Sequence, residues 1–340
     1  MTGPARPPAP EEDPLEGLTV LERGWLSSNN LLIHPAPGEA GAVLVDTSHV
    51  THAPQTLALV RHALAGQPLA RIVNTHLHSD HCGGNAALHS ALGAPVFVPP
   101  GLAEAVNRWD ARKLSYDDIG QLCARYTADA ELPAGGTLRA GGRIWEVLAA
   151  PGHDPDSVVL FDRAHGVLVS ADALWEDGFG VIFPELDGHS GFEEAGAVLE
   201  LIASLPVRVV VPGHGAPFTD VAGALARARS RLDGHRRDPA RHARHAVKVL
   251  VKYHLMELGG EPLDAFQAWA ARTPFLARVW DRHGRAHART PGQWGEAFLG
   301  ELAASGLARI EPGWVNDAAR PSRPSAPARA TPAQNIPHEN

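Results

Sequence analysis

The sequence has only two cysteines, Cys82 and Cys123, among its 340 residues. Two cysteines cannot form a disulfide framework or a thiolate zinc site, so we expect both to be small buried side chains. The sequence also lacks any apolar run near the ~20 residues that span a bilayer. Its first sixteen residues are proline-rich and acidic, unlike the basic and then apolar start of an export signal. We therefore expect a globular protein of the cytoplasm that has no membrane partner.

The chain is short of positive charge, with 30 Lys and Arg against 38 Asp and Glu and a net charge of −8. This balance disfavours wholesale binding to nucleic acid. The deficit is uneven, because residues 231–290 hold twelve Lys and Arg against six Asp and Glu. We interpret this basic segment as a solvated helix face, with a nucleic-acid contact as the alternative.

The length and the 44% of hydrophobic residues predict two domains with a sizeable core. Proline-rich stretches at 1–16 and 318–340 predict disordered ends. Between them, β-rich patterns with turn signals alternate with helical spacing over 17–235, and a mainly helical pattern occupies 240–316. The sequence therefore predicts an α/β domain followed by a small helical unit.

The densest group of potential metal ligands lies at residues 75–81, Thr-His-Leu-His-Ser-Asp-His, directly after the apolar run 70–74. If that run is a strand, His76 and His78 project to the same side, because side chains alternate along extended backbone. A turn at Ser79 would direct Asp80 and His81 toward a second position close by. Imidazole and carboxylate ligands suit zinc, iron or manganese, and two such ions can hold the hydroxide needed for hydrolysis.

Three further candidates, His153, Asp172 and His214, each follow a predicted strand, and loops at strand ends are where proteins present functional side chains. The alternative is a polar surface that holds histidines by chance, since the chain contains 19 of them. The repeated position at strand ends favours a metal site.

This order of residues, His-x-His-x-Asp-His and then His153, Asp172 and His214, resembles the signature of the metallo-β-lactamase superfamily over about 18–235. The resemblance implies an α/β fold, a four-layer αββα sandwich whose loops at one edge hold two metal ions. It implies that His76, His78 and His153 bind the first ion, that Asp80, His81 and His214 bind the second, and that Asp172 bridges the two. Asp46, near the end of the predicted strand 42–47, matches an aspartate that supports the metal site from beneath.

An aspartate at position 172 is typical of the glyoxalase II-like, lactonase-like and nuclease-like branches, whereas the best-known zinc β-lactamases have a cysteine there. We therefore expect a binuclear hydrolase, with zinc ahead of iron or manganese, whose bridging hydroxide attacks a small thioester, lactone or ester. Asp80 is the candidate for moving the proton of that hydroxide. The apolar loop 175–192 either lines the substrate pocket or packs under the second unit.

The C-terminal pattern, three helices and a terminal hairpin, resembles a winged helix, an appendage of some superfamily members. This resemblance keeps a second hypothesis open, a nuclease that holds RNA or DNA through the C-terminal unit. A third, an iron-dependent persulfide oxygenase, is disfavoured by His214 and the full set of seven ligands. We expect the C-terminal helices to cover the pocket mouth or to form a subunit interface, in which case the protein is a homo-oligomer.

Overall fold

Two mixed β-sheets face each other in the computed structural model, which describes residues 13–133 and 135–319. Within these residues, the first sheet has six strands in the order β1 Leu18–Leu21, β2 Asn30–Ile33, β3 Ala42–Val45, β4 Leu69–Val73, β5 Val96–Val98 and β6 Ala130–Glu131. The second has five, in the order β11 Val209–Pro212, β10 Val167–Ala171, β9 Val158–Asp162, β8 Arg143–Ala149 and β7 Thr137–Ala140.

The alternation of side chains along the strands explains why both faces of each sheet are buried. In β3, Val43 and Val45 point into the core between the two sheets, whereas Ala42 and Leu44 point to the outer face. In β10, Val167 contributes to the same central core, and Leu168 packs on the outer face of the second sheet. Strands of this kind are apolar throughout, and they need a cover on both sides.

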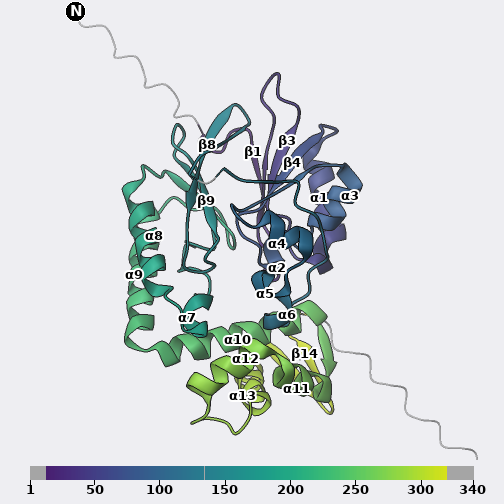
Figure 1. The fold of residues 1–340 in the computed structure, drawn as a ribbon, viewed down its shortest axis with the longest axis vertical. Coiled ribbons are helices and arrows are strands. Elements are labelled where there is room, and N and C mark those ends of the chain that lie inside the picture. Colours follow the sequence, from purple (N-terminus) through teal and green to yellow (C-terminus); the bar gives the residue numbers. More distant parts are fainter. Residues whose placement is uncertain (1–12, 134, 320–340) are drawn as a thin grey trace, which may run out of the picture.

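Helices supply that cover (Figure 1). On the outer face of the first sheet lie α1 Ala53–Leu64 and α3 Asn85–Leu92, which ends at Gly93 with φ +69°. On the outer face of the second sheet lie α8 Phe192–Ser204 and α9 Val221–Arg237. The predicted four-layer αββα sandwich is thus confirmed.

Short helices connect the layers at one end of the sandwich. They are η1 Val50–His52, α2 Ser79–Cys82, α4 Ala103–Arg108, α5 Ala111–Leu114, α6 Tyr116–Ile119 and α7 Phe183–Asp187. The turn that the sequence predicts at Ser79 is therefore the start of one helical turn, α2. Residues 113–118 lie in α5 and α6 and the turn between them.

The C-terminal unit has the element order of a winged helix. A long helix comes first, a strand and further helices follow, and a hairpin ends the unit: α10 Pro239–Leu258, β12 Gly260–Pro262, α11 Leu263–Arg272, α12 Pro274–Val279, the π-helical turn η2 Trp280–Gly284, α13 Pro291–Ala304, β13 Ala308–Glu311 and β14 Trp314–Asp317. The strands pair in the order β12-β14-β13. The unit has its own apolar core, which Val181, Leu186 and Ile119 of the sandwich join.

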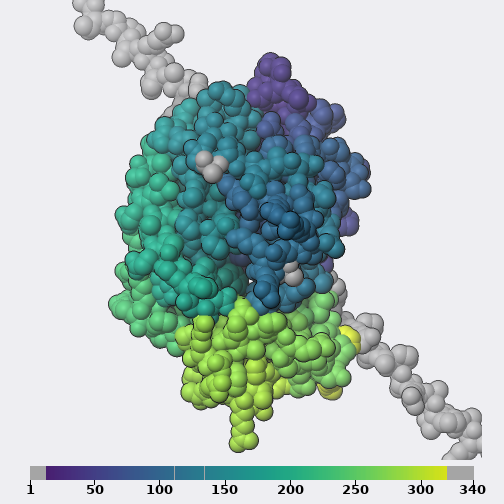
Figure 2. All heavy atoms as spheres, in the orientation of Figure 1, coloured from purple at the N-terminus to yellow at the C-terminus, as the bar shows by residue number. Residues whose placement is uncertain are grey.

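The connection between the sandwich and the C-terminal unit is helical on both sides. Helix α9 continues to Arg237, and α10 begins at Pro239. Asp238 between them caps α10 by accepting a hydrogen bond from the Arg241 amide. The result is a tight corner, and residues of the C-terminal unit, in green and yellow, cover the lower end of both halves of the sandwich in Figure 2.

The predicted disordered ends fall mostly outside the described residues. Residues 13–16 are described and form a turn, in which the Pro14 and Glu16 carbonyls accept hydrogen bonds from Arg143. Within the described part of the chain, no helix is long and apolar enough to cross a membrane.

Candidate metal centre

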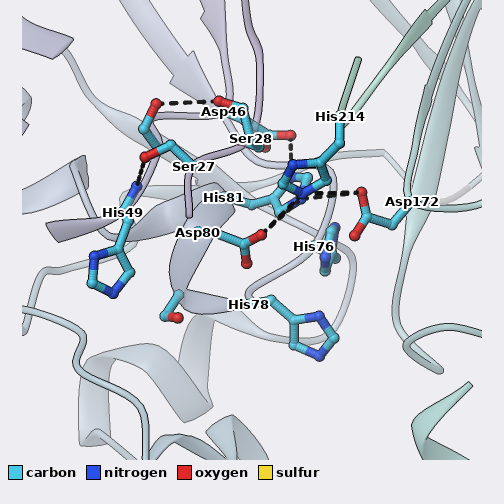
Figure 3. A network of polar contacts seen from close by, with 12 residues as sticks. Ser27, Ser28, Asp46, His49, His76, His78, Asp80, His81, Asp172 and His214 are labelled. Carbon is cyan, nitrogen blue, oxygen red and sulfur yellow. Dashed lines mark hydrogen bonds and ion pairs between the residues drawn. The ribbon is translucent and has the colours of Figure 1, made fainter. Parts of the chain in front are cut away.

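The structure brings all seven predicted ligands together at one edge of the sandwich. His76 and His78 follow β4, His153 follows β8, Asp172 follows β10, and His214 follows β11. Helix α2 supplies Asp80 and His81. The ligand atoms form two groups, in each of which they lie within 4.8 Å of one another: His76, His78 and His153, and Asp80, His81, Asp172 and His214. Figure 3 shows the residues from β4, α2, β10 and β11 converging from different elements.

In the first group, three imidazoles converge on one point. His78 Nδ1 and His153 Nε2 are 2.7 Å apart. His153 Nδ1 lies 2.6 Å from the Val181 carbonyl oxygen, so this nitrogen carries the hydrogen and Nε2 is left with a lone pair. His76 Nε2 is buried and has no hydrogen-bond partner in the structure. Buried orphan nitrogens are costly unless a cation binds them.

In the second group, imidazoles and carboxylates alternate. His214 Nε2 lies 3.1 Å from Asp80 Oδ2, and His81 Nε2 lies 3.8 Å from the same oxygen. His81 Nε2 is a second buried nitrogen without a hydrogen-bond partner. The donors are nitrogen and oxygen with no thiolate, a set that suits zinc, iron or manganese. The residues present therefore fit a divalent ion in each group.

Asp172 lies between the two groups. Its Oδ1 is 3.3 Å from His81 Nε2, in the second group, and its Oδ2 is 3.4 Å from His153 Nε2, in the first. The indole Nε1 of Trp175 donates a hydrogen bond to Oδ1 across 3.2 Å, which fixes the orientation of the carboxylate. Each oxygen of Asp172 can thus serve a different ion.

Asp46 holds the site from beneath, where the sequence places it. Its carboxylate accepts hydrogen bonds from the Thr75 amide, the Thr75 hydroxyl and His81 Nδ1, at 2.9, 2.8 and 2.8 Å. The backbone at Asp46 has φ +59°, a left-handed conformation that aspartate tolerates better than most residues. A carboxylate behind a ligating histidine sets the tautomer and the ring orientation of that histidine.

The electrostatics of the site suit cation binding. Burial lowers the pKa of His78 and of His153 to about 4, so both imidazoles are neutral at neutral pH. Burial also lowers the pKa of His76. The pKa of His81 is raised well above its usual value, because the Asp172, Asp46 and Asp80 carboxylates outweigh the opposing effect of burial. Neutral imidazoles beside an excess of carboxylate make a site that attracts positive charge.

A cavity of about 490 Å³ opens onto the metal centre. The predicted apolar loop contributes Trp175, Phe179, Val181 and Phe183 to its wall. The C-terminal helix α10 adds His245, Val249, Leu250 and Tyr253. Helix α10 therefore covers part of the cavity, and Tyr253 reaches α2 through a hydrogen bond of 2.7 Å between its hydroxyl and Ser79 Oγ.

Several residues of the site had no signal in the sequence. Trp25, in the loop after β1, is 65% exposed and stacks on His214, with ring centroids 5.6 Å apart. Arg231 of α9 and Tyr253 of α10 also line the cavity. Nothing in the local sequence marks Arg231 or Tyr253, because it is the packing of α9 and α10 against the sandwich that brings them to the cavity.

Comparison with known proteins agrees with this geometry. The family model described as metallo-beta-lactamase superfamily matches residues 23–214, more than half of the chain. A hydroxyacylglutathione hydrolase from Polaromonas sp. (strain JS666 / ATCC BAA-500) is 28% identical over 218 residues, which cover 61% of this chain and 71% of the relative. A probable metallo-hydrolase from Bacillus subtilis (strain 168) is 31% identical over 159 residues, 45% of this chain and 71% of the relative.

The chain spans a smaller share, 47–64%, of other hydroxyacylglutathione hydrolases that it matches. Among solved structures, a metallo-beta-lactamase family protein from Thermus thermophilus superposes with a TM-score of 0.53 at 22% identity, over 88% of this chain and 98% of that one. This likeness concerns the fold, and it extends over most of the chain.

Proposed function

Since the chain belongs to the metallo-beta-lactamase superfamily and is a metal-dependent hydrolase, we propose that it cleaves a small thioester, lactone or ester at a binuclear metal centre. The observation that carries the proposal is Asp172, whose two oxygens lie 3.3 and 3.4 Å from one histidine of each group. A carboxylate can hold two cations together and reduce their mutual repulsion, a task that one neutral imidazole cannot perform.

We propose His76, His78 and His153 as ligands of the first ion, Asp80, His81 and His214 as ligands of the second, and Asp172 as the bridge. Two divalent ions of this kind, zinc first, would supply Lewis acidity and lower the pKa of bound water. The protein's own groups orient the reactants. Burial acts to raise the pKa of Asp80, but His81 and His214 outweigh it, so this pKa falls to about 2 and the carboxylate is ionised at neutral pH. Asp80 can then accept a hydrogen bond from the attacking water and relay its proton.

The cavity supports a small acyl substrate. Its volume of about 490 Å³ falls in the range of small-molecule sites, and the aromatic and aliphatic side chains of the loop 175–183 and of α10 form most of its wall. The relatives named hydroxyacylglutathione hydrolase hydrolyse, by that name, an acyl derivative of glutathione, which supports the same class of reaction.

The structure gives less support to the nuclease hypothesis. The last helix before the hairpin of a winged helix is the element expected to contact nucleic acid. Here this helix, α13, contains Glu296 and Glu301 and has neither Lys nor Arg. Many basic side chains of the segment 231–290 form ion pairs within the protein: Arg236 with Glu193, Arg244 and Lys248 with Glu301, Lys252 with Asp317, and Arg278 with Asp118 and Asp187. Their charge is therefore largely compensated.

A substrate panel with metal analysis tests the proposal. Protein purified without chelator should carry close to two transition-metal ions per chain, hydrolyse at least one thioester, lactone or ester, and lose this activity to a chelator. Single-stranded RNA in the same panel, together with retention on heparin at rising salt, tests the nuclease alternative. A metal-free enzyme with full activity, or cleavage of RNA alone, would overturn the proposal.

A further inference from the structure

Arg231 supplies the only Lys or Arg side chain among the described residues that line the metal-centre cavity. It lies just past the middle of α9, and it is half-buried. The acidic residues of the same wall are the proposed ligands Asp80 and Asp172 and, farther along the loop, Glu176 and Asp177. A single guanidinium in an otherwise apolar and acidic cavity needs an explanation, because desolvating a charge is costly.

The contacts of Arg231 leave its charge uncompensated. Nη2 donates to His245 Nε2 across 2.8 Å, and Nη1 donates to the Asp177 backbone carbonyl across 3.4 Å. The guanidinium also lies over the ring of Phe179, 5.6 Å from its centroid. Within the described residues, no carboxylate forms an ion pair with it: the Asp177 side chain is 87% exposed and pairs with Arg227 at 3.2 Å.

The neighbouring histidine adds no charge. Burial and the proximity of Arg231 lower the pKa of His245 to about 4, so the imidazole is neutral at neutral pH and accepts from the guanidinium through Nε2. Burial also lowers the pKa of Arg231 below its usual value. A guanidinium has five N–H groups, of which the contacts to His245 and Asp177 use two. Three donors are left for a ligand.

The distance from Arg231 to the metals suits a small molecule. A Cβ built on Gly178 would lie 2.6 Å from Arg231 Nη1, and a Cβ built on Gly180 would lie 2.4 Å from His153 Nδ1. The guanidinium of Arg231 and the imidazole of His153, a proposed metal ligand, are thus separated by two residues of backbone, a distance on the order of 10 Å. Val249 and Leu250 of α10 and Val181 line the same cavity and make its wall apolar.

We propose that Arg231 binds an anionic group of the substrate, a carboxylate or a phosphate, at the end opposite the carbonyl that is cleaved. This inference rests on the proposed function and names its substrate class, an acyl compound with an acidic terminus and an apolar middle. The planar fork of the guanidinium matches the two oxygens of such a group. The anion also supplies the negative partner that the positive charge of Arg231 lacks.

Two matched thioesters of N-acetylcysteamine test the proposal: glutaryl, which has a terminal carboxylate, and its terminal amide, which is neutral. We expect the wild type to prefer the glutaryl compound by about 10- to 100-fold in kcat/KM, mostly through KM, as for a charge-assisted hydrogen bond. Arg231→Met should lose most of this preference, because its kcat/KM falls much more on the glutaryl compound than on the amide. Arg231→Lys should retain part of it, since the charge stays and the fork is lost.

Arg227→Met is the matched control, because Arg227 lies one turn earlier on α9, pairs with Asp177 and Asp220, and does not line the cavity. It should behave as the wild type. Equal rates of the wild type on both thioesters, or an equal loss on both in Arg231→Met, would overturn the proposal. An analogue with a phosphonate in place of the distal carboxylate shows which anion the site prefers.

Binding without turnover separates this proposal from the proposed function. Calorimetry on metal-loaded protein compares glutarate with butyrate, which has the same apolar part and a single carboxylate. The wild type should bind glutarate at least tenfold more tightly, and Arg231→Met should bind both alike. If no thioester is hydrolysed but this difference holds, the proposed function fails and the anion site stands. If the wild type binds both acids alike, the anion site is wrong, whatever the enzyme hydrolyses.

Discussion

His81 donates its Nδ1 hydrogen to Asp46 Oδ2 across 2.8 Å, although the two residues are 35 positions apart in the chain. Strand β3 ends one residue before Asp46, and α2 carries His81, so the contact joins the first sheet to the metal-binding helix. Because Nδ1 donates to Asp46, Nε2, the atom that faces Asp172, is the nitrogen available to an ion. The position of one proposed ligand therefore depends on a residue that touches no metal.

Asp46→Asn should weaken the metal site without unfolding the protein. Asparagine tolerates the left-handed backbone at this position, with φ +59°, but it lacks the charge that orients His81 and Thr75. We expect the affinity for the second ion to fall by about 10- to 100-fold, measured by titration against a competing chelator. The control is Asp129→Asn. The Asp129 carboxylate accepts a hydrogen bond from the Val96 amide, and in the sequence it lies far from the proposed metal ligands. Unchanged affinity in Asp46→Asn would show that Asp46 does not position His81.

Asp172→Asn should convert a binuclear site into a mononuclear one. The amide has nearly the same shape but no charge, while His76, His78 and His153 still give the first ion three ligands, the number that a catalytic zinc site needs. Elemental analysis after desalting should give close to one ion per chain, and turnover should fall by orders of magnitude. Circular dichroism should be unchanged, because the side chain lies at a strand end. Two tightly held ions with undiminished turnover would show that Asp172 is not the bridge.

Gly180→Ala should displace His153. A Cβ at this position would lie 2.4 Å from His153 Nδ1 and 2.8 Å from Cε1, closer than any real contact, so the imidazole has to move. The hydrogen bond from Nδ1 to the Val181 carbonyl would be disturbed as well. We expect a loss of metal from the first group and at least a tenfold loss of turnover, since small displacements of a catalytic group are costly. Gly234→Ala, in α9 with open space around it, is the control and should keep both metals.

The histidines at the corner between α9 and α10 should make the stability of the protein depend on pH. His242 is 1% exposed, and burial, followed by the proximity of His235, His245 and Arg231, lowers its pKa to about 3. The unfolded chain, with a histidine pKa of about 6.5, binds this proton first as the pH falls. The contribution of the neutral His242 to the free energy of unfolding is therefore fully present above about pH 6.5. It decreases as the pH falls from there toward 3.

At pH 5 the protonation of His242 alone lowers the free energy of unfolding by roughly 2 kcal/mol. His242→Gln removes the titration and keeps an acceptor for the Ile182 amide, which donates to Nε2 across 3.3 Å in the wild type. The difference in Tm between pH 7.5 and pH 5 should be smaller in this variant than in the wild type. His62→Gln, at an exposed histidine of α1, should leave the difference unchanged. An equal difference in all three proteins would contradict the assignment.

The sequence by itself determined the strands and helices of the first domain and a set of candidate ligands, and the resemblance to a known superfamily supplied the four-layer sandwich. Apolar runs between turn signals mark the strands, helical spacing marks α1 and α3, and the short-range order of residues 76–81 places four candidate ligands within six positions. These signals are local, because the period of a strand or helix and the reach of a loop are properties of a few neighbouring residues. The identity of Asp172 and of Asp46 followed from resemblance, since strand-end aspartates are otherwise common turn residues.

Only the tertiary structure decided what surrounds the metals. The orientation of His81 by Asp46 and of His153 by the Val181 carbonyl depends on pairs that are 35 and 28 positions apart. The cavity wall formed by α10 depends on the corner at Asp238, and the charge pattern of the segment 231–290 could not show which of its arginines lines the cavity. Arg227 and Arg231 lie one turn apart on α9, yet only Arg231 lines the cavity. This difference depends on how the helix packs on its neighbours, a balance of many weak contacts that no single stretch of sequence contains.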